Sequence, residues 1–155
     1  MSEKEFEYRW TTGEDPDFER FHSITEAYYN KLAGGAENRK AFTPNNTGKN
    51  VRDALVVYDG KTPIACSALR HYNELDIEIK RVWVEPEYRR NGLGMEMLKR
   101  LEKRAREKGY KRLILQTRKE MASAMWLYTK LGFTRIENYP PYDKLPDAAC
   151  LGKEL

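Results

Sequence analysis

The stretch IEIKRVWVEPEYRRNGLG, residues 77–94, places arginine and glycine residues directly after a run of strand-forming residues. This run lies within residues 75–86, which end at Pro86. Its strand-forming residues predict a strand that the proline ends. From Gly92 to Gly109, charged residues surround one apolar stripe at helical spacing, formed by Leu98, Leu101 and Ala105. This pattern predicts an amphipathic helix. The arginines and glycines therefore occupy the turn between a strand and a helix.

A glycine turn at the start of a helix is suited to holding phosphate. The first N–H groups of a helix lack intrahelical partners and lie at the positive end of its dipole. Glycine lets the backbone approach an anion closely, although a plain tight turn explains the glycines equally well. The sequence lacks the G-x-x-x-x-G-K-[ST] pattern of a Walker loop. Met97 stands where a dinucleotide-binding fingerprint needs its third glycine.

The rest of the chain predicts further strands and helices around this unit. Strands are expected at 5–12, in a hairpin over 53–72 around Asp59-Gly60, and at 111–117, 133–139 and 148–155. Helices are expected at 18–32 and 121–132. Residues 36–50 are polar and predict a loop, with room for a short helical turn. This order predicts a mixed α/β sheet covered by helices.

Length and composition fit one domain spanning residues 1–155. A chain of 155 residues with 40% apolar content can bury a proper core. No apolar run approaches the ~20 residues of a membrane helix, and the start lacks the apolar segment of a secretory signal. We therefore expect a cytoplasmic protein without a membrane partner. Cys66 and Cys150 lie in apolar strand-like runs, which predicts buried free thiols and no metal site.

Positive charge is concentrated around the arginine and glycine turn. Residues 80–112 hold twelve Lys or Arg against five acids, whereas residues 1–79 hold ten against fourteen. Such a surplus suits a nucleic acid, a membrane surface or a phosphorylated cofactor, although a solvated helix face also explains it. The basic segment has few aromatic residues and no nucleic-acid motif, so we expect no nucleic-acid partner.

Two motifs resemble the GNAT superfamily of N-acetyltransferases. Arg89, Gly92 and Gly94 form R-x-x-G-x-G, which is similar to its acetyl-coenzyme A signature. AMWLYTKLGF, residues 124–133, is similar to its A-x-x-L-Y-x-x-x-G-F helix. The motifs cover residues 76–135, and the order of elements agrees upstream. Resemblance to small bacterial members implies a largely antiparallel sheet of six or seven strands, about four helices, and fourth and fifth strands splayed around coenzyme A.

The resemblance implies cofactor contacts for particular residues. The backbone of the turn would hold the pyrophosphate of acetyl-CoA (Arg89, Arg90, Asn91, Gly92, Leu93, Gly94). Val82, Trp83 and Val84 match residues that pair their backbone with pantetheine, as an unpartnered strand edge can. Their side chains would be ordinary core in the alternative interpretation. Met121 stands where some relatives carry an asparagine, so the sequence does not support a side-chain contact to the cofactor there.

Tyr128 and Glu78 are the candidate catalytic residues. Tyr128 matches the superfamily's general acid, which protonates the leaving thiolate and lies beside the cofactor; packing is the alternative. Glu78 lies on the fourth strand, where several members carry a catalytic glutamate that takes the proton of the attacking ammonium. Alternation would put Glu78, Lys80, Val82 and Val84 on one face. A structural ion pair with Lys80 or Arg81, and water chains as the base, are the alternatives.

The expected acceptor is the primary amine of a small molecule. Several basic residues could rim the acceptor side and suit an amine bearing a carboxylate, such as an amino acid (Arg39, Arg70, His71, Lys80, Arg81, Arg118). Surface charge explains them as well. Acetylation of protein N-termini or lysines, acetylation of polyamines or drug amines, and a catalytically silent acetyl-CoA sensor stay open as alternatives, as does a homodimer.

Overall fold

A seven-stranded sheet forms the centre of the computed structural model, which describes residues 5–32, 51–118 and 121–155. The strands lie in the order β1-β2-β3-β4-β5-β7-β6. Their bounds are β1 Glu7–Thr11, β2 Asp53–Asp59, β3 Thr62–His71, β4 Asp76–Val84, β5 Arg112–Arg118, β6 Thr134–Ile136 and β7 Ala148–Glu154. All neighbours pair antiparallel except β4 and β5, which are parallel. The predicted mixed, largely antiparallel sheet is confirmed.

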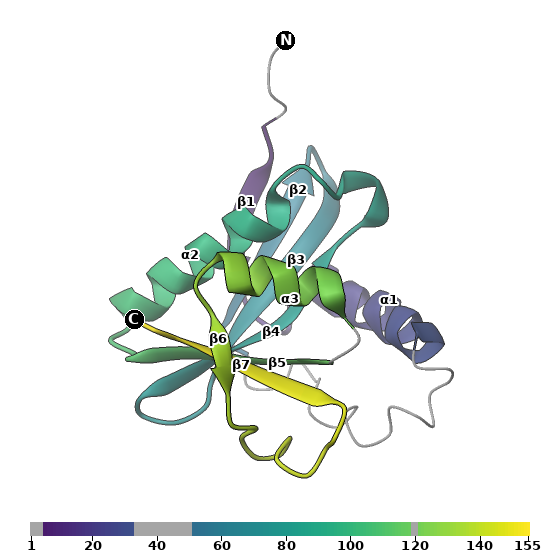
Figure 1. Cartoon of the computed structure of the whole chain (residues 1–155). Coiled ribbons are helices and arrows are strands. Elements are labelled where there is room, and N and C mark those ends of the chain that lie inside the picture. The colour runs from purple at the N-terminus through teal and green to yellow at the C-terminus, as the bar shows by residue number, and fades with distance from the viewer. Residues whose placement is uncertain (1–4, 33–50, 119–120) are drawn as a thin grey trace.

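Helices cover both faces of this sheet (Figure 1). Within the described residues they are α1 Pro16–Leu32, α2 Leu93–Glu107, α3 Ala122–Lys130 and a short 3-10 helix, η3, at Pro86–Tyr88. None of these described helices is long and apolar enough to cross a membrane. The loop expected at 36–50 lies outside the described residues. Because α2 connects β4 to β5, these two strands can run parallel.

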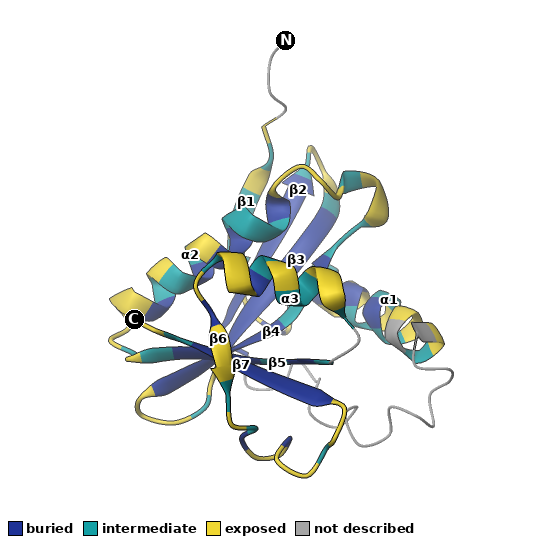
Figure 2. Ribbon diagram, viewed as in Figure 1, coloured by how far each residue is buried: buried dark blue, intermediate teal, exposed yellow. Residues whose placement is uncertain are grey.

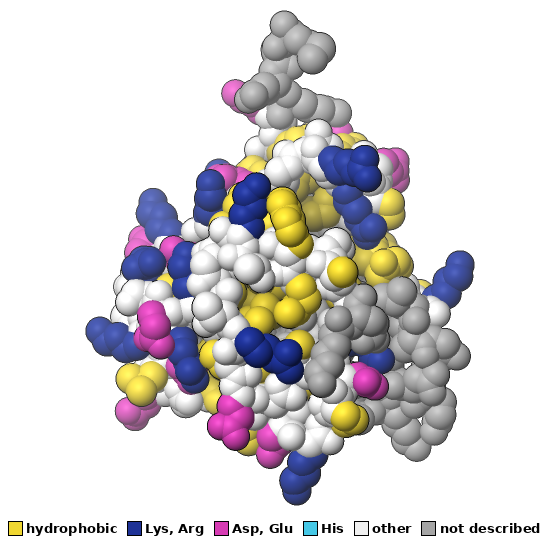
Figure 3. Space-filling view, in the orientation of Figure 1, with side chains coloured by type: hydrophobic (Ala, Val, Ile, Leu, Met, Phe, Trp, Pro, Cys, Tyr) yellow, Lys and Arg dark blue, Asp and Glu magenta, His cyan; other side chains and the backbone are white. Residues whose placement is uncertain are grey.

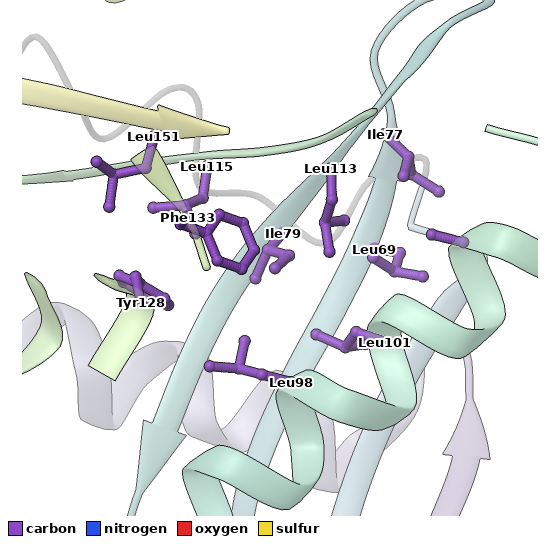
Figure 4. Packing of buried hydrophobic residues seen from close by; sticks show 11 residues of the cluster. Leu69, Ile77, Ile79, Leu98, Leu101, Leu113, Leu115, Tyr128, Phe133 and Leu151 are labelled. Carbon is purple, nitrogen blue, oxygen red and sulfur yellow. The ribbon is translucent and has the colours of Figure 1, made fainter. Parts of the chain in front are cut away.

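Buried side chains fill the space between the sheet and the helices (Figure 2). On one face, Leu98 and Leu101 of α2 pack against sheet residues that include Leu69 and Leu113 (Figure 4). On the other face, Phe18 of α1 packs in a cluster with β2 and β3. A strand that is buried on both faces has a continuous run of apolar residues instead of an alternating pattern, and β2 is such a strand. Cys66 and Cys150 are buried free thiols, as predicted.

Local signals explain where α1 and the first hairpin begin and end. The Asp15 carboxylate accepts hydrogen bonds from the N–H groups of Asp17 (2.9 Å) and Phe18 (3.2 Å), which caps α1. The predicted hairpin turns at Gly60, whose φ of 61° suits a glycine. Asp59 pairs with Thr62 across that turn.

A bulge interrupts β4 after its first five residues. In the register with β3, Ala68 faces Lys80 and Cys66 faces Trp83, so β4 contains one extra residue. Arg81, within the bulge, has a positive φ of 54°. An extra residue of this kind changes the face on which all later side chains lie.

The expected alternation along β4 is therefore wrong beyond Lys80. Val82 and Val84 pack with the cluster that contains Leu93 and Met97 of α2. Trp83 packs on the opposite face, with Phe18 of α1. Glu78 and Lys80 thus do not share a face with the two valines, because the bulge shifts the two-residue period of the strand.

Asp53 links the start of β2 to the end of α2, and Asp53→Asn is expected to destabilise the fold. Its carboxylate, on a residue 8% exposed, accepts hydrogen bonds from Arg104 (2.9 Å) and from Lys108. Losing this charge should lower the free energy of unfolding by about 1–2 kcal/mol, because both partners are partly solvated. Urea unfolding of the two proteins measures this difference in the free energy of unfolding. The exposed Glu7–Arg9 pair provides the control, since Glu7→Gln should leave the unfolding midpoint unchanged.

Candidate active site

β4 and β5 separate beyond their first four paired residues. Their pairing runs from Asp76 and Arg112 to Ile79 and Leu115, although β4 continues to Val84 and β5 to Arg118. Past this point β4 remains paired with β3, and β5 with β7. The expected splay is present. It leaves two strand edges facing one another without shared hydrogen bonds, and an exposed strand edge can bind an extended amide chain.

A pocket occupies the gap between the separated strands. Its walls come from α1, β4, β5 and α3. Tyr128 and Val82 line it, as does Met121. The described residues that line this pocket do not include Glu78, Trp83 or Val84. The structure therefore brings one of the two candidate catalytic side chains to this pocket and leaves the other behind the β4 wall.

The turn at residues 89–94 contains two residues with left-handed backbone just before α2. Arg90 and Gly92 both have left-handed backbone, with φ of 67° and 76°, and Gly92 is the residue at which α2 begins. No side chain of the described residues caps this helix end. Left-handed residues occur in turns whose successive N–H groups form a concavity for anions, and a helix start adds its positive dipole. The backbone N–H groups of this turn could donate hydrogen bonds to a phosphate.

Aromatic contacts fix the turn to the rest of the fold. The Arg89 guanidinium lies over the rings of Trp83 (4.9 Å) and Tyr28 (5.8 Å) and donates from Nε to the Val84 carbonyl at 2.9 Å. Tyr88 donates to Asp59 at 2.6 Å. Lys and Arg side chains also project along α2 beside this region (Figure 3). These contacts anchor the turn to the end of β4 and to the hairpin of β2 and β3.

Gly94 has a packing role in addition to its place in the cofactor motif. A Cβ at this position would lie 3.3 Å from the Leu127 side chain of α3. That distance is tight, so an alanine here would require the Leu127 side chain to shift by a few tenths of an ångström. Leu127 precedes Tyr128 in α3, so α2 and α3 are in contact beside the candidate acid.

Tyr128 lies at the junction of the pocket and the core. It is 7% exposed and packs edge-on against Phe133, with ring centroids 5.8 Å apart. Figure 4 shows Tyr128 close to Phe133, beside Leu115 and Leu151. The same side chain lines the pocket. The packing interpretation is therefore confirmed, and the residue also forms part of the pocket wall, where its role as the acid stays a prediction.

Glu78 belongs to a buried polar cluster on the other side of β4. One carboxylate oxygen accepts a hydrogen bond from Tyr139 at 2.7 Å, and the other lies 3.8 Å from the Lys80 ammonium. Lys80 donates to the Tyr142 hydroxyl at 2.6 Å. The Glu78–Lys80 ion pair that was the structural alternative is present in the structure.

Burial shifts the pKa values of three side chains in this cluster. It raises the pKa values of the Tyr139 and Tyr142 phenols, with the Glu78 charge acting in the same direction. Burial also lowers the pKa of Lys80, against the opposing effect of Glu78, while Arg70 and Arg81 lower it further. A lysine in these surroundings gives up its proton more easily than one on the surface.

The basic residues expected around the acceptor separate into two groups. Lys80, Arg81 and Arg118 line the pocket between β4 and β5. Arg70 and His71 instead line a second pocket, near the C-terminal end of α2. There the His71 ring contacts the Tyr110 hydroxyl at 2.6 Å. Arg39 lies outside the described residues.

Several pocket residues were missed from the sequence. His22, Thr25 and Glu26 of α1 complete the wall on one side. The helical spacing of α1 predicted its apolar stripe, but no local signal indicated which polar residues would face the gap. Tyr139 and Tyr142 were missed for a different reason, because they meet Glu78 and Lys80 only through contacts 61 and 62 residues apart along the chain.

The sheet with its two separated strands, and the pocket between them, agree with the fold expected for an acetyltransferase. The chain belongs to the acetyltransferase (GNAT) family, whose sequence pattern matches residues 2–133. It is 32% identical to an IAA acetyltransferase of Azospirillum brasilense over 102 residues, which cover 65% of this chain and 67% of that relative.

Solved structures of similar fold extend over nearly the whole chain. A Klebsiella pneumoniae protein assigned as an acyl-CoA N-acyltransferase has a TM-score of 0.81 at 23% identity, covering 99% of both chains. A GNAT family acetyltransferase from Elizabethkingia anophelis, with acetyl-CoA bound, has a TM-score of 0.69 at 19% identity. That comparison covers 99% of this chain and 100% of the other. At these identities the likeness concerns the fold.

Proposed function

We propose that this protein transfers the acetyl group of acetyl-CoA to the primary amine of a small molecule by direct attack. The observation that carries the proposal is the position of Tyr128 in a pocket between two splayed strands, next to an uncapped helix start. The acetyl-CoA bound to the Elizabethkingia relative supports the choice of donor. We also propose that the chain acts as a single domain in the cytoplasm, where acetyl-CoA is available.

The cofactor would lie along the open edge of β4. The backbone of residues 89–94 would hold the pyrophosphate, with Arg89 and Arg90 adding positive charge. The amides of pantetheine would pair with the backbone of Val82, Trp83 and Val84. Only the backbone is needed for this pairing, which is compatible with the burial of the Trp83 side chain in the core.

The chemistry then needs an acid and a base. The neutral amine attacks the thioester carbonyl, the tetrahedral intermediate collapses, and the carbon–sulfur bond breaks. Tyr128 would give its proton to the departing sulfur, and the proton that the nitrogen loses on becoming an amide would restore the phenol through solvent. A base must first remove a proton from the acceptor ammonium, and we place that step on the side of the pocket formed by Lys80, with Glu78 behind it.

Charge in the pocket wall supports an acceptor that carries a carboxylate. The wall contains the permanently charged Arg81 and Arg118 against the single acid Glu26 among the described residues. A carboxylate bound there would form charge-assisted hydrogen bonds, each worth about 1.5–3 kcal/mol. The acceptor class we favour is therefore amino acids and related small amines.

A panel of amines tests this assignment, with release of coenzyme A thiol as the measurement. We expect an amino acid to be acetylated with a kcat/KM about tenfold or more above that of its own amide, which lacks the negative charge. Equal rates for the two would contradict the carboxylate site. Preference for peptides or for polyamines would instead support the corresponding alternative acceptor. Acetyl-CoA binding without turnover of any amine would indicate a silent sensor.

A further inference from the structure

Lys80 connects the pocket to the buried polar cluster behind β4. Of the four residues in that cluster, Lys80 alone lines the pocket, whereas Glu78, Tyr139 and Tyr142 do not. Its ammonium nitrogen is hydrogen-bonded to Tyr142 at 2.6 Å and lies 3.8 Å from Glu78. Lys80 is therefore the residue through which the cluster contacts the pocket.

Glu78 itself is poorly placed to meet an acceptor. The residue is 4% exposed, and one of its carboxylate oxygens accepts the Tyr139 hydroxyl proton at 2.7 Å. The other oxygen faces the Lys80 ammonium. A general base must lie within hydrogen-bonding reach of the proton it removes, directly or through one water. Lys80 is the residue of this cluster that lines the pocket.

We infer that Lys80 accepts the proton of the acceptor ammonium, and that Glu78 acts through Lys80 by setting its charge. This inference rests on the proposed function. In the step, neutral Lys80 takes one proton from the ammonium, which leaves a neutral amine and a charged lysine. The amine then attacks the thioester. Lys80 later returns its proton to solvent, and Tyr142 and Glu78 stabilise its charged form meanwhile.

The electrostatic surroundings favour a lysine that can lose its proton. Burial lowers the pKa of Lys80, and the positive charges of Arg70 and Arg81 act in the same direction, whereas Glu78 opposes them. The titratable and charged groups around it come from every adjoining element (Glu78, Arg81, Arg70, Tyr139, Tyr142, His22, Glu26, Arg118, Tyr128). Removing Glu78 alone should therefore lower the pKa of Lys80.

Lys80→Arg provides the first test because arginine keeps a long basic side chain in the pocket wall but stays protonated and cannot accept a proton. Arginine stays charged at all working pH values, so an acceptor carboxylate could still bind. We expect kcat to fall about a hundredfold or more with a nearly unchanged KM for the acceptor. The control is Lys99→Arg, the same change at an exposed position of α2, which should keep wild-type kinetics.

Glu78→Gln provides the second test, and its result depends on which residue is the base. Glutamine can still accept the Tyr139 hydrogen bond, so the fold should be retained. If Lys80 is the base, the acidic limb of the kcat/KM profile should move to lower pH while activity at high pH persists. If Glu78 is the base, turnover should collapse at every pH. The same acceptor is used throughout, so its own titration cannot cause the difference.

The two tests together separate this inference from the proposed function. A wild-type protein that acetylates no amine would overturn the proposed function and this inference with it. Turnover by the wild type with an unaffected Lys80→Arg variant would overturn only the inference. Among the described residues of the pocket wall, His22 is a second side chain with a nitrogen that can accept a proton. The kcat/KM profile of His22→Asn could lose its acidic limb while that of Lys80→Arg keeps it. This result would assign proton removal to His22 and contradict the proposed role of Lys80.

Discussion

Gly92→Asp is expected to abolish acetyl-CoA binding while the protein stays folded. Gly92 has a φ of 76°, and a Cβ at this position would meet no atom within 4 Å. Aspartate is among the residues that tolerate left-handed backbone best, so the substitution should cost little stability. Its carboxylate would occupy the helix start where the pyrophosphate is expected. Like charges brought together in a site cost several kcal/mol, so affinity should fall about a hundredfold or more.

Gly92→Asn is the matched control for this experiment. Asparagine has nearly the same shape as aspartate and also tolerates left-handed backbone, but it carries no charge. Calorimetric titration with acetyl-CoA should therefore show partial affinity for Gly92→Asn and none for Gly92→Asp. Equal losses in the two variants would attribute the effect to side-chain bulk. Wild-type affinity in the aspartate variant would mean that the pyrophosphate binds elsewhere.

The parts of the structure that the sequence predicted are those set by local periodicity. The strand before Pro86 consists of a run of strand-forming residues, and the helix after Gly92 has an apolar stripe at helical spacing; both formed where expected. Gly60 and Gly92 predicted turns because a positive φ is least costly for glycine. These signals depend only on neighbouring residues, so they survive in any surrounding fold.

The bulge in β4 could not be predicted in the same way. Its left-handed residue is Arg81, and arginine gives no local indication of a positive φ. The bulge depends on pairing with β3, where one residue fewer spans the same length. The prediction assumed regular alternation along the strand, and it therefore placed Val82 and Val84 on the wrong face of the sheet. The consequence for the site is that Lys80 and Val82, two residues apart, approach the pocket from different faces of the sheet.

The candidate site was only partly predictable for a related reason. The resemblance pointed to Tyr128 and the 89–94 turn, which both lie within continuous motifs. The polar cluster around Glu78 depends on Tyr139 and Tyr142, which approach from a segment between β6 and β7. No spacing in the sequence connects those tyrosines to β4. The charged partners of a candidate base are therefore known only once the chain is folded.

The close contact between Gly94 and Leu127 joins the two halves of the proposed site. Gly94 lies in the first turn of α2, beside the helix start that would hold phosphate. Leu127 immediately precedes Tyr128 on α3. Since the two helices touch at a glycine, with only 3.3 Å available for a Cβ, a cofactor held by the turn would have a fixed position relative to the phenol. Such fixed geometry is what general acid catalysis requires.

Tyr128→Phe is expected to lower turnover by roughly ten- to a thousandfold with little change in acetyl-CoA affinity. Phenylalanine keeps the ring that packs edge-on against Phe133, so stability should change little. Only the proton donor for the departing sulfur is lost. Steady-state kinetics with the best amine of the panel measures the effect, and calorimetry measures cofactor affinity. Tyr110→Phe, which removes a phenol that contacts His71 outside this pocket, should leave turnover unchanged.

The nature of the leaving group gives this experiment a second comparison. A thiolate leaves less readily without a proton donor, so the defect of Tyr128→Phe should shrink as the pKa of the leaving thiol is lowered in a series of acetyl thioesters. If Tyr128 instead only packs against Phe133, the variant should lose stability and keep its turnover for every thioester. Wild-type turnover in a stable variant would contradict the acid role directly, and the sulfur would then take its proton from water.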